Sequence, residues 1–136
     1  RENQMICLIG ARIESFILGK GLQDSLKRAI AYSKAGADLI LIHSKEKNPK
    51  EIFLFAKKFK KTKYFKPLVS VPSTYSKTSE KQLIDNGFRV VIYANQLLRA
   101  AFPAMEFAAK TILKKKRSFE LENKISSVKD IINLIK

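Results

Sequence analysis

The chain has 136 residues, which is enough for one domain with a hydrophobic core. Its 46% apolar content excludes a disordered composition, its single cysteine excludes an internal disulfide framework, and its longest apolar runs fall short of a membrane span of roughly 20 residues. The 27 Lys and Arg residues against 12 Asp and Glu residues give a net charge of +15, which favours either a polyanionic partner or a lysine-rich solvated surface.

The distribution of charge and the N-terminal residues bear on two questions, whether the protein binds nucleic acid and where it is located. The basic residues are mostly lysines spread over predicted helix faces, without an RNA-binding or helix-turn-helix pattern beside them. We therefore expect a solvated surface and no nucleic-acid partner, with a basic nucleic-acid-binding module as the alternative from another class. The N-terminus lacks a signal-peptide pattern, so we expect a cytoplasmic protein without a membrane partner. Cys7 lies in an apolar run and is predicted to be a small buried residue.

Four short apolar runs have the continuous hydrophobic character of buried parallel strands. They cover Met5–Ala11, Ala37–Ile42, Leu68–Val71 and Val90–Ala94. A helical pattern follows each run, and this alternation predicts a parallel sheet with right-handed crossovers.

The first two predicted helices have clear apolar faces. The first should end near Gly36, and its face is formed by Leu22, Leu26, Ala29 and Ile30. The second should begin with Asn48 as cap, Pro49 at its first position and Glu51 closing a pair that resembles a capping box. Its apolar face is formed by Ile52, Phe55, Ala56 and Phe59.

The later helices are predicted mainly from capping and breaking signals. Ser79 and Gln82 bracket a short third helix that ends at Gly87. A longer fourth helix runs from about Gln96 to Lys116, and Pro103 should kink or break it. Ser127 with Asp130 opens a last short helix that includes Ile131, Ile132 and Ile135.

Four βα units plus a C-terminal helix fit either a small open α/β sheet or half of a (β/α)₈ barrel. A complete barrel needs about 250 residues, which is roughly twice the length of this chain. The chain also begins without methionine only four residues before its first predicted strand. We therefore expect residues 1–136 to form a single partial domain, the C-terminal half of a barrel.

Polar side chains follow the predicted strands, where the chemistry of parallel α/β folds collects. Arg12, His43 and Asn95 come at the ends of the first, second and fourth strands and could share one mouth. Each has an alternative role: Arg12 could pair only with Glu14, His43 could be a loop residue, and Asn95 could cap the following helix.

Arginine and histidine together suit a compact anionic substrate. The guanidinium offers a planar fork of donors to phosphoryl, phosphonyl or carboxylate oxygens, and the imidazole changes charge near neutral pH. The sequence has no nucleophile elbow and no glycine-rich phosphate loop. With one histidine and one cysteine, the chain lacks the Cys and His ligands of a zinc cluster.

Four motifs resemble the C-terminal half of phosphoenolpyruvate mutase, in the isocitrate lyase/phosphoenolpyruvate mutase superfamily of (β/α)₈ barrels. They read "ARIESFILGKGLQDSLKRAIAYSKAGADLILIHSK", "PLVSVPSTY", "VVIYANQLLRAA" and "ENKISSVKDII", and they occur in the family's order over nearly the whole chain. Two positions depart from the family pattern, Gln96 where a histidine is usual and Pro103 where a small residue is usual.

The resemblance implies an isomerase that interconverts phosphoenolpyruvate and phosphonopyruvate with Mg²⁺ at the start of phosphonate biosynthesis. Arg12 matches the arginine that holds the migrating phosphoryl group, and His43 matches the histidine beside it. The family's magnesium carboxylates and closing loop belong to the first half of the barrel, so no metal ligand is expected here and Glu14 is not taken as a replacement. The resemblance also implies a homo-oligomer, a dimer or tetramer, that could exchange the last barrel helix around Gln96–Lys116.

Several alternatives remain open from the sequence. Phosphonopyruvate hydrolase shares almost every one of these motifs, and a carbon–carbon lyase of the isocitrate or methylisocitrate type is a more distant option. The chain could also be a non-catalytic remnant or a split half that needs a partner chain. In each enzymatic case we expect the 136 residues alone to be inactive.

Overall fold

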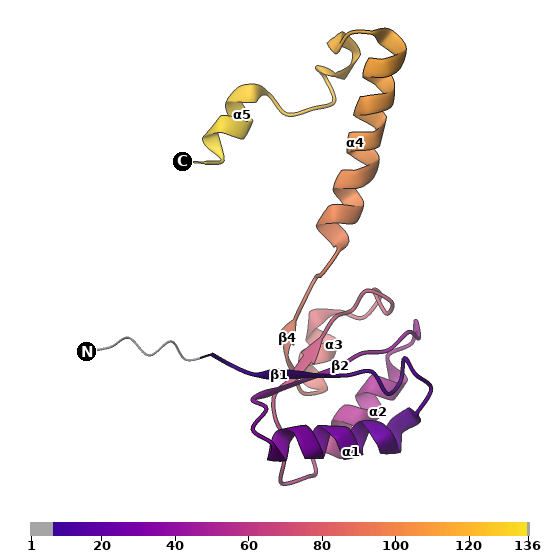
Figure 1. Ribbon diagram of the computed structural model, residues 1–136, viewed down its shortest axis with the longest axis vertical. Coiled ribbons are helices and arrows are strands. Elements are labelled where there is room, and N and C mark those ends of the chain that lie inside the picture. The colour runs from indigo at the N-terminus through magenta and orange to yellow at the C-terminus, as the bar shows by residue number, and fades with distance from the viewer. Residues whose placement is uncertain (1–6, 136) are drawn as a thin grey trace, which may run out of the picture. The chain divides into compact units, whose positions relative to one another are not determined.

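Four parallel strands form one sheet in the computed structural model, which describes residues 7–135. The strands are β1 (Gly10–Ile13), β2 (Leu39–Ile42), β3 (Leu68–Ser70) and β4 (Phe88–Val91), and their order in the sheet is their order in the sequence. The crossovers contain α1 (Gly21–Lys34), α2 (Lys50–Phe59) and α3 (Glu80–Asp85), as Figure 1 shows. The predicted alternation of strands and helices is confirmed.

One face of the sheet forms the hydrophobic core with the three helices. Strand side chains alternate between faces, and the core takes Ile13 from β1, Ile40 and Ile42 from β2, Leu68 from β3 and Phe88 from β4. The helices contribute the buried residues Ala29, Ile52, Phe55, Ala56, Phe59 and Leu83. The apolar faces predicted for α1 and α2 therefore do pack toward the sheet.

The opposite face of the sheet carries a different row of side chains. Arg12 pairs in register with Leu41, Leu41 with Val69, and Val69 with Val90, so one residue from each strand lines up across the sheet. Leu41 is only partly buried and Val90 is exposed. In a closed barrel this row would face the interior, where the substrate site opens at the strand ends.

Removing the ring of Phe59 should strongly destabilise the sheet and the helices that pack on it. Phe59 is 0% exposed at the end of α2, with its ring 5.5 Å from that of Phe55 and 5.6 Å from that of Phe65. We expect Phe59→Ala to lower the free energy of unfolding by about 3–5 kcal/mol, because it leaves a cavity in the core. Thermal and urea denaturation measure this, with Leu54→Ala as the control because Leu54 on the same helix is 46% exposed. Equal losses in both variants would contradict the described packing of α2.

The helix signals in the sequence are confirmed in part. Ser79 and Gln82 form the predicted capping box at the start of α3. α2 begins at Lys50 with Pro49 in the capping position and no capping side-chain bond, which corrects the predicted cap at Asn48 and first position at Pro49. The Asn48 side chain does accept the backbone N–H of Lys50, at 3.1 Å. Gly36 follows α1 with a φ of +104°, a conformation that favours glycine. The capping role predicted for Glu51 is wrong, because its carboxylate instead accepts a hydrogen bond from the Ser44 hydroxyl in the loop after β2.

The limits of the first and last strands differ from the prediction. Among the described residues β1 begins at Gly10 and continues to Ile13, because its partner β2 extends to Ile42. Residues 5 and 6 lie outside the described residues. Cys7 is exposed, which corrects its predicted burial, since it precedes the paired part of the strand. β4 begins directly after Gly87 and ends at Val91, earlier than predicted, because pairing with β3 sets its length.

The chain divides into two units, one ending at Ala94 and one beginning at Asn95. The second unit contains α4 (Gln96–Lys115), the 3₁₀ helix η1 (Phe119–Leu121) and α5 (Val128–Asn133), with η1 in contact with α4. Pro103 was predicted to kink or break the helix, and the break is wrong, since α4 continues through Pro103. The kink stays a prediction. In the described residues, no helix combines the length and apolarity that a membrane span requires. That the whole chain forms a single partial domain stays a prediction.

Candidate functional site

Arg12 and His43 lie near the carboxyl ends of two neighbouring strands, β1 and β2. Arg12 is part of β1 and pairs with Leu41 of β2, so it lies inside the strand and not just beyond it as predicted. His43 follows β2 directly, and it lies close enough to Arg12 for the charge of the guanidinium to lower its pKa. The structure thus brings together the two residues that the sequence analysis singled out.

The guanidinium of Arg12 forms an ion pair with the Glu14 carboxylate, through its Nε atom. This is the pairing that the sequence left open as an alternative. The side chains are 53% and 38% exposed, and ion pairs at such exposure contribute at most about 1 kcal/mol. The pair is therefore weak enough for an anionic ligand to compete with Glu14 for the guanidinium.

A small cavity of about 200 Å³ adjoins Arg12 and Glu14. It extends along α1 to Arg28, whose guanidinium is held by Asp24 at 2.8 Å. Asp24 also accepts a hydrogen bond from Ser15 at 2.6 Å, and these two partners, Ser15 first, lower the pKa of its carboxyl group. Arg28 is thus engaged with its own helix, which leaves Arg12 as the better placed cation for a ligand at the strand ends.

The imidazole of His43 is in an environment that disfavours its charged form. Burial lowers its pKa below the usual value, the positive charge of Arg12 lowers it further, and Glu14 partly opposes both effects. Its Nδ1 atom is buried and, among the described residues, has no hydrogen-bond partner. The lowered pKa favours the neutral imidazole at pH 7.

The titration of His43 should report directly on anion binding. We expect it to titrate below its usual pKa of 6.5 without ligand, and to shift upward when inorganic phosphate binds, because negative charge stabilises imidazolium. NMR of the imidazole follows this, the signal being assigned by its loss in His43→Gln. Arg12→Gln should raise the ligand-free pKa and Glu14→Gln should lower it, since the two charges act in opposite directions. A ligand-free pKa at or above 6.5 would contradict this description.

A hydrogen-bond network behind His43 was missed by the sequence analysis. The fully buried Ser44 donates its hydroxyl to Glu51 of α2, and its carbonyl accepts the hydroxyl of Thr74 at 2.7 Å. The only signal in the sequence was the position of Ser44 next to His43. Nothing local indicated Thr74, which lies 30 residues further along the chain.

Asn95, the third candidate, belongs to the second unit. Its side chain makes no capping hydrogen bond to α4, so the capping role that was its alternative is wrong. Instead its backbone N–H donates to the Gln96 side chain at 3.1 Å. The position of Asn95 in a shared mouth stays a prediction.

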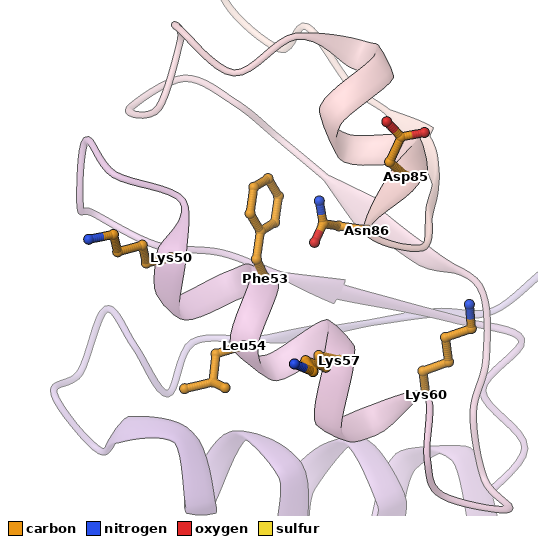
Figure 2. A pocket seen from close by; sticks show the side chains of 7 residues that line it. All are labelled: Lys50, Phe53, Leu54, Lys57, Lys60, Asp85 and Asn86. Atoms are coloured by element: carbon orange, nitrogen blue, oxygen red, sulfur yellow. The ribbon is translucent and has the colours of Figure 1, made fainter.

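A larger hollow of about 450 Å³ lies between α2 and the end of α3, on the helix side of the sheet. Figure 2 shows the ring of Phe53 rising from α2 toward Asn86, with lysine side chains around it. The lysines are the exposed residues Lys50, Lys57 and Lys60. Neither Arg12 nor His43 lines this hollow, so it is not assigned to the same chemistry.

Within residues 7–135, no three His, Cys, Asp or Glu side chains come together in a way that could hold a metal ion. Glu14 is the carboxylate nearest the Arg12 and His43 pair in the sequence, and it is engaged by Arg12. Mg²⁺ takes oxygen ligands such as carboxylates, and the described residues bring no group of three such side chains together.

The family model described as "Phosphoenolpyruvate phosphomutase" matches residues 1–113. The chain belongs to the phosphoenolpyruvate phosphomutase family. Among its relatives is a phosphoenolpyruvate phosphomutase of Tetrahymena pyriformis, 40% identical over 124 residues, which are 91% of this chain and 40% of the relative. The chain thus spans about two fifths of the length of this relative of the phosphomutase family.

Solved structures of the phosphomutase family agree with the fold. The crystal structure of a phosphoenolpyruvate phosphomutase from Streptomyces platensis subsp. rosaceus matches with a TM-score of 0.86 and 36% identity, over 93% of this chain and 43% of that one. A phosphonopyruvate hydrolase in complex with oxalate and Mg²⁺ matches with a TM-score of 0.83 and 38% identity, over 93% and 44%. The coverage is that of half a barrel, so the predicted fold class is confirmed.

Proposed function

We propose that this chain is the C-terminal half-barrel of a phosphoenolpyruvate phosphomutase and that it supplies Arg12 and His43 to the substrate site. The observation that supports the proposal is that Arg12 and His43 come from the carboxyl ends of two neighbouring strands, β1 and β2. Active sites of (β/α)₈ barrels form at this end of the strands. Membership of the phosphomutase family supports the reaction.

The chemistry of the two residues suits transfer of a phosphoryl group. The transition state is loose, with negative charge spread over the oxygens of the group, so catalysis depends on positioning and electrostatic stabilisation. The planar fork of Arg12 can hold two of these oxygens, and the neutral imidazole of His43 can donate one hydrogen bond beside it. Both residues are anchored to strand ends, so little reorganisation is needed when charge develops.

Mg²⁺ is proposed as a requirement of the complete protein and not of this chain. The support is the phosphonopyruvate hydrolase relative whose structure contains Mg²⁺ and oxalate. Since the described residues offer no ligand cluster, we infer that the ligands lie in the part of the barrel that the relatives have beyond this match. No step of the reaction is assigned here to the metal.

Incubation of the complete protein with phosphonopyruvate and Mg²⁺, followed by ³¹P NMR, tests the proposal. A phosphomutase converts phosphonopyruvate to phosphoenolpyruvate, whereas a hydrolase would release pyruvate and phosphate. The hydrolase is the second candidate, because a protein of that name is as similar in sequence and fold as the phosphomutases. Turnover of an isocitrate-like acid with no reaction of phosphonopyruvate would instead indicate a carbon–carbon lyase.

The substrate, the cellular location and the oligomeric state of the complete protein belong to the same proposal. The substrate is a small anion, and we propose a cytoplasmic enzyme at the start of phosphonate biosynthesis. We also propose a homo-oligomer in which α4 packs on another subunit, because within its own unit α4 has no buried residue and exposes Leu97, Leu98, Phe102 and Met105. Analytical ultracentrifugation of the complete protein distinguishes a dimer or tetramer from a monomer.

A further inference from the structure

Resting on the proposed role of His43, we propose that Glu51, Ser44 and Thr74 are positioning residues that fix the backbone directly after His43. Ser44 is 0% exposed, although it lies in a loop. Its hydroxyl donates to the Glu51 carboxylate and accepts the backbone N–H of Glu46 at 2.9 Å. A buried serine with both hydrogen-bonding directions used is held in one orientation.

Thr74 fixes the same residue from a different element. Its hydroxyl, in the loop after β3, donates to the backbone carbonyl of Ser44 at 2.7 Å. Ser44 is therefore tied to the first turn of α2 through Glu51 and to the neighbouring loop through Thr74. On its other side, His43 is preceded by Ile42, which is paired with Ile13 in the sheet.

The consequence is that the backbone of His43 is fixed from both directions. A side chain on such a backbone can be presented to a substrate with little loss of conformational freedom, which favours turnover more than ground-state binding. The Glu51 bond has a charged acceptor and is the stronger kind of hydrogen bond. A purely structural role of this network predicts a different result, namely lower stability with normal turnover in the protein that stays folded.

Two matched pairs of variants in the complete protein separate these roles. Glu51→Ala removes the acceptor, whereas Glu51→Gln keeps an oxygen at its place. Thr74→Val removes the hydroxyl with nearly the same shape, whereas Thr74→Ser keeps it. Thr74 is exposed, so its variants test the proposal even where Glu51→Ala fails to fold.

Steady-state kinetics with phosphonopyruvate should show a loss in kcat and not in KM. We expect Glu51→Ala and Thr74→Val to lower kcat about tenfold or more, with KM within about threefold, because a small displacement of a catalytic group is costly. Glu51→Gln and Thr74→Ser should stay within about threefold of the wild type. Normal kcat in both Glu51→Ala and Thr74→Val, with the fold intact by circular dichroism, would overturn the proposal.

Imidazole NMR separates failure of this inference from failure of the proposed function. If the wild-type protein converts neither phosphonopyruvate nor phosphoenolpyruvate, the proposed function fails and the NMR decides the positioning alone. We expect the ring signals of His43 to shift or broaden in Glu51→Ala and Thr74→Val, but not in Glu51→Gln and Thr74→Ser. Unchanged His43 signals in all four variants would overturn the positioning role whatever the enzyme's activity.

Discussion

Replacing Arg12 by alanine in the complete protein is expected to lower kcat/KM for phosphonopyruvate about a thousandfold, while the protein stays folded. The guanidinium is the described group best placed to hold the oxygens of the transferring phosphoryl group. Its only described ion-pair partner is Glu14, in a pair that is too exposed to stabilise the fold much. Steady-state kinetics and thermal denaturation of the same preparation measure the two effects separately.

The controls for Arg12 follow from the geometry of its head group. Arg12→Lys keeps the charge but loses the planar fork, so we expect it to recover only part of the lost activity. Arg89→Ala removes an exposed arginine of β4 and should leave kcat/KM within about threefold of the wild type. If Arg12→Ala retained most of its activity, the assignment of the anion site to β1 would be wrong.

The second large effect concerns the 136 residues alone, which are expected to show no detectable turnover of phosphonopyruvate even with Mg²⁺ present. In the described sheet, β1 and β4 are edge strands, and the row from Arg12 to Val90 lies on the face opposite the core helices. Open edges and an apolar face favour association over a defined site. The described residues also offer no ligand cluster for Mg²⁺.

Adding the other half of the barrel should reverse this inactivity. Co-expression with the N-terminal part of the same protein is expected to restore turnover, and the same co-expression with Arg12→Ala in this chain should not. Phosphonopyruvate turnover by the purified 136 residues alone would show that the site needs no second half. An enzyme-coupled assay for pyruvate or phosphoenolpyruvate measures turnover both in the co-expressed halves and in the 136 residues alone.

Much of the fold could be predicted from local signals in the sequence, although the capping pair at Asn48 and Glu51 shows that a local signal can also mislead. The apolar face of α2 and the Ser79–Gln82 capping box depend on residues three or four apart, and both are confirmed. The limits of β1 could not be predicted, because they are set by pairing with β2, about 30 residues away. An apolar run shows that a strand is near, but its partner decides where the strand begins and ends.

The candidate site shows the same division between local and distant information. His43 directly follows an apolar run, so its place at a strand end was predicted. Arg12 was predicted to lie just after the first strand, whereas the strand extends to Ile13 and includes it. The role of Glu51 was misassigned because its spacing from Asn48 fits a capping box, whereas its actual partner is Ser44 in the preceding loop. Thr74 gave no signal at all, since its bond to Ser44 exists only once β2 and β3 lie side by side.

The most direct test of the account is a crystal structure of the complete protein with phosphonopyruvate or phosphoenolpyruvate bound. We predict that the phosphonyl or phosphoryl oxygens lie within hydrogen-bonding distance of the Arg12 guanidinium and the His43 imidazole, with Glu14 displaced from Arg12. A ligand bound elsewhere, for example among the lysines of the hollow between α2 and α3, with Arg12 still paired to Glu14, would contradict the account.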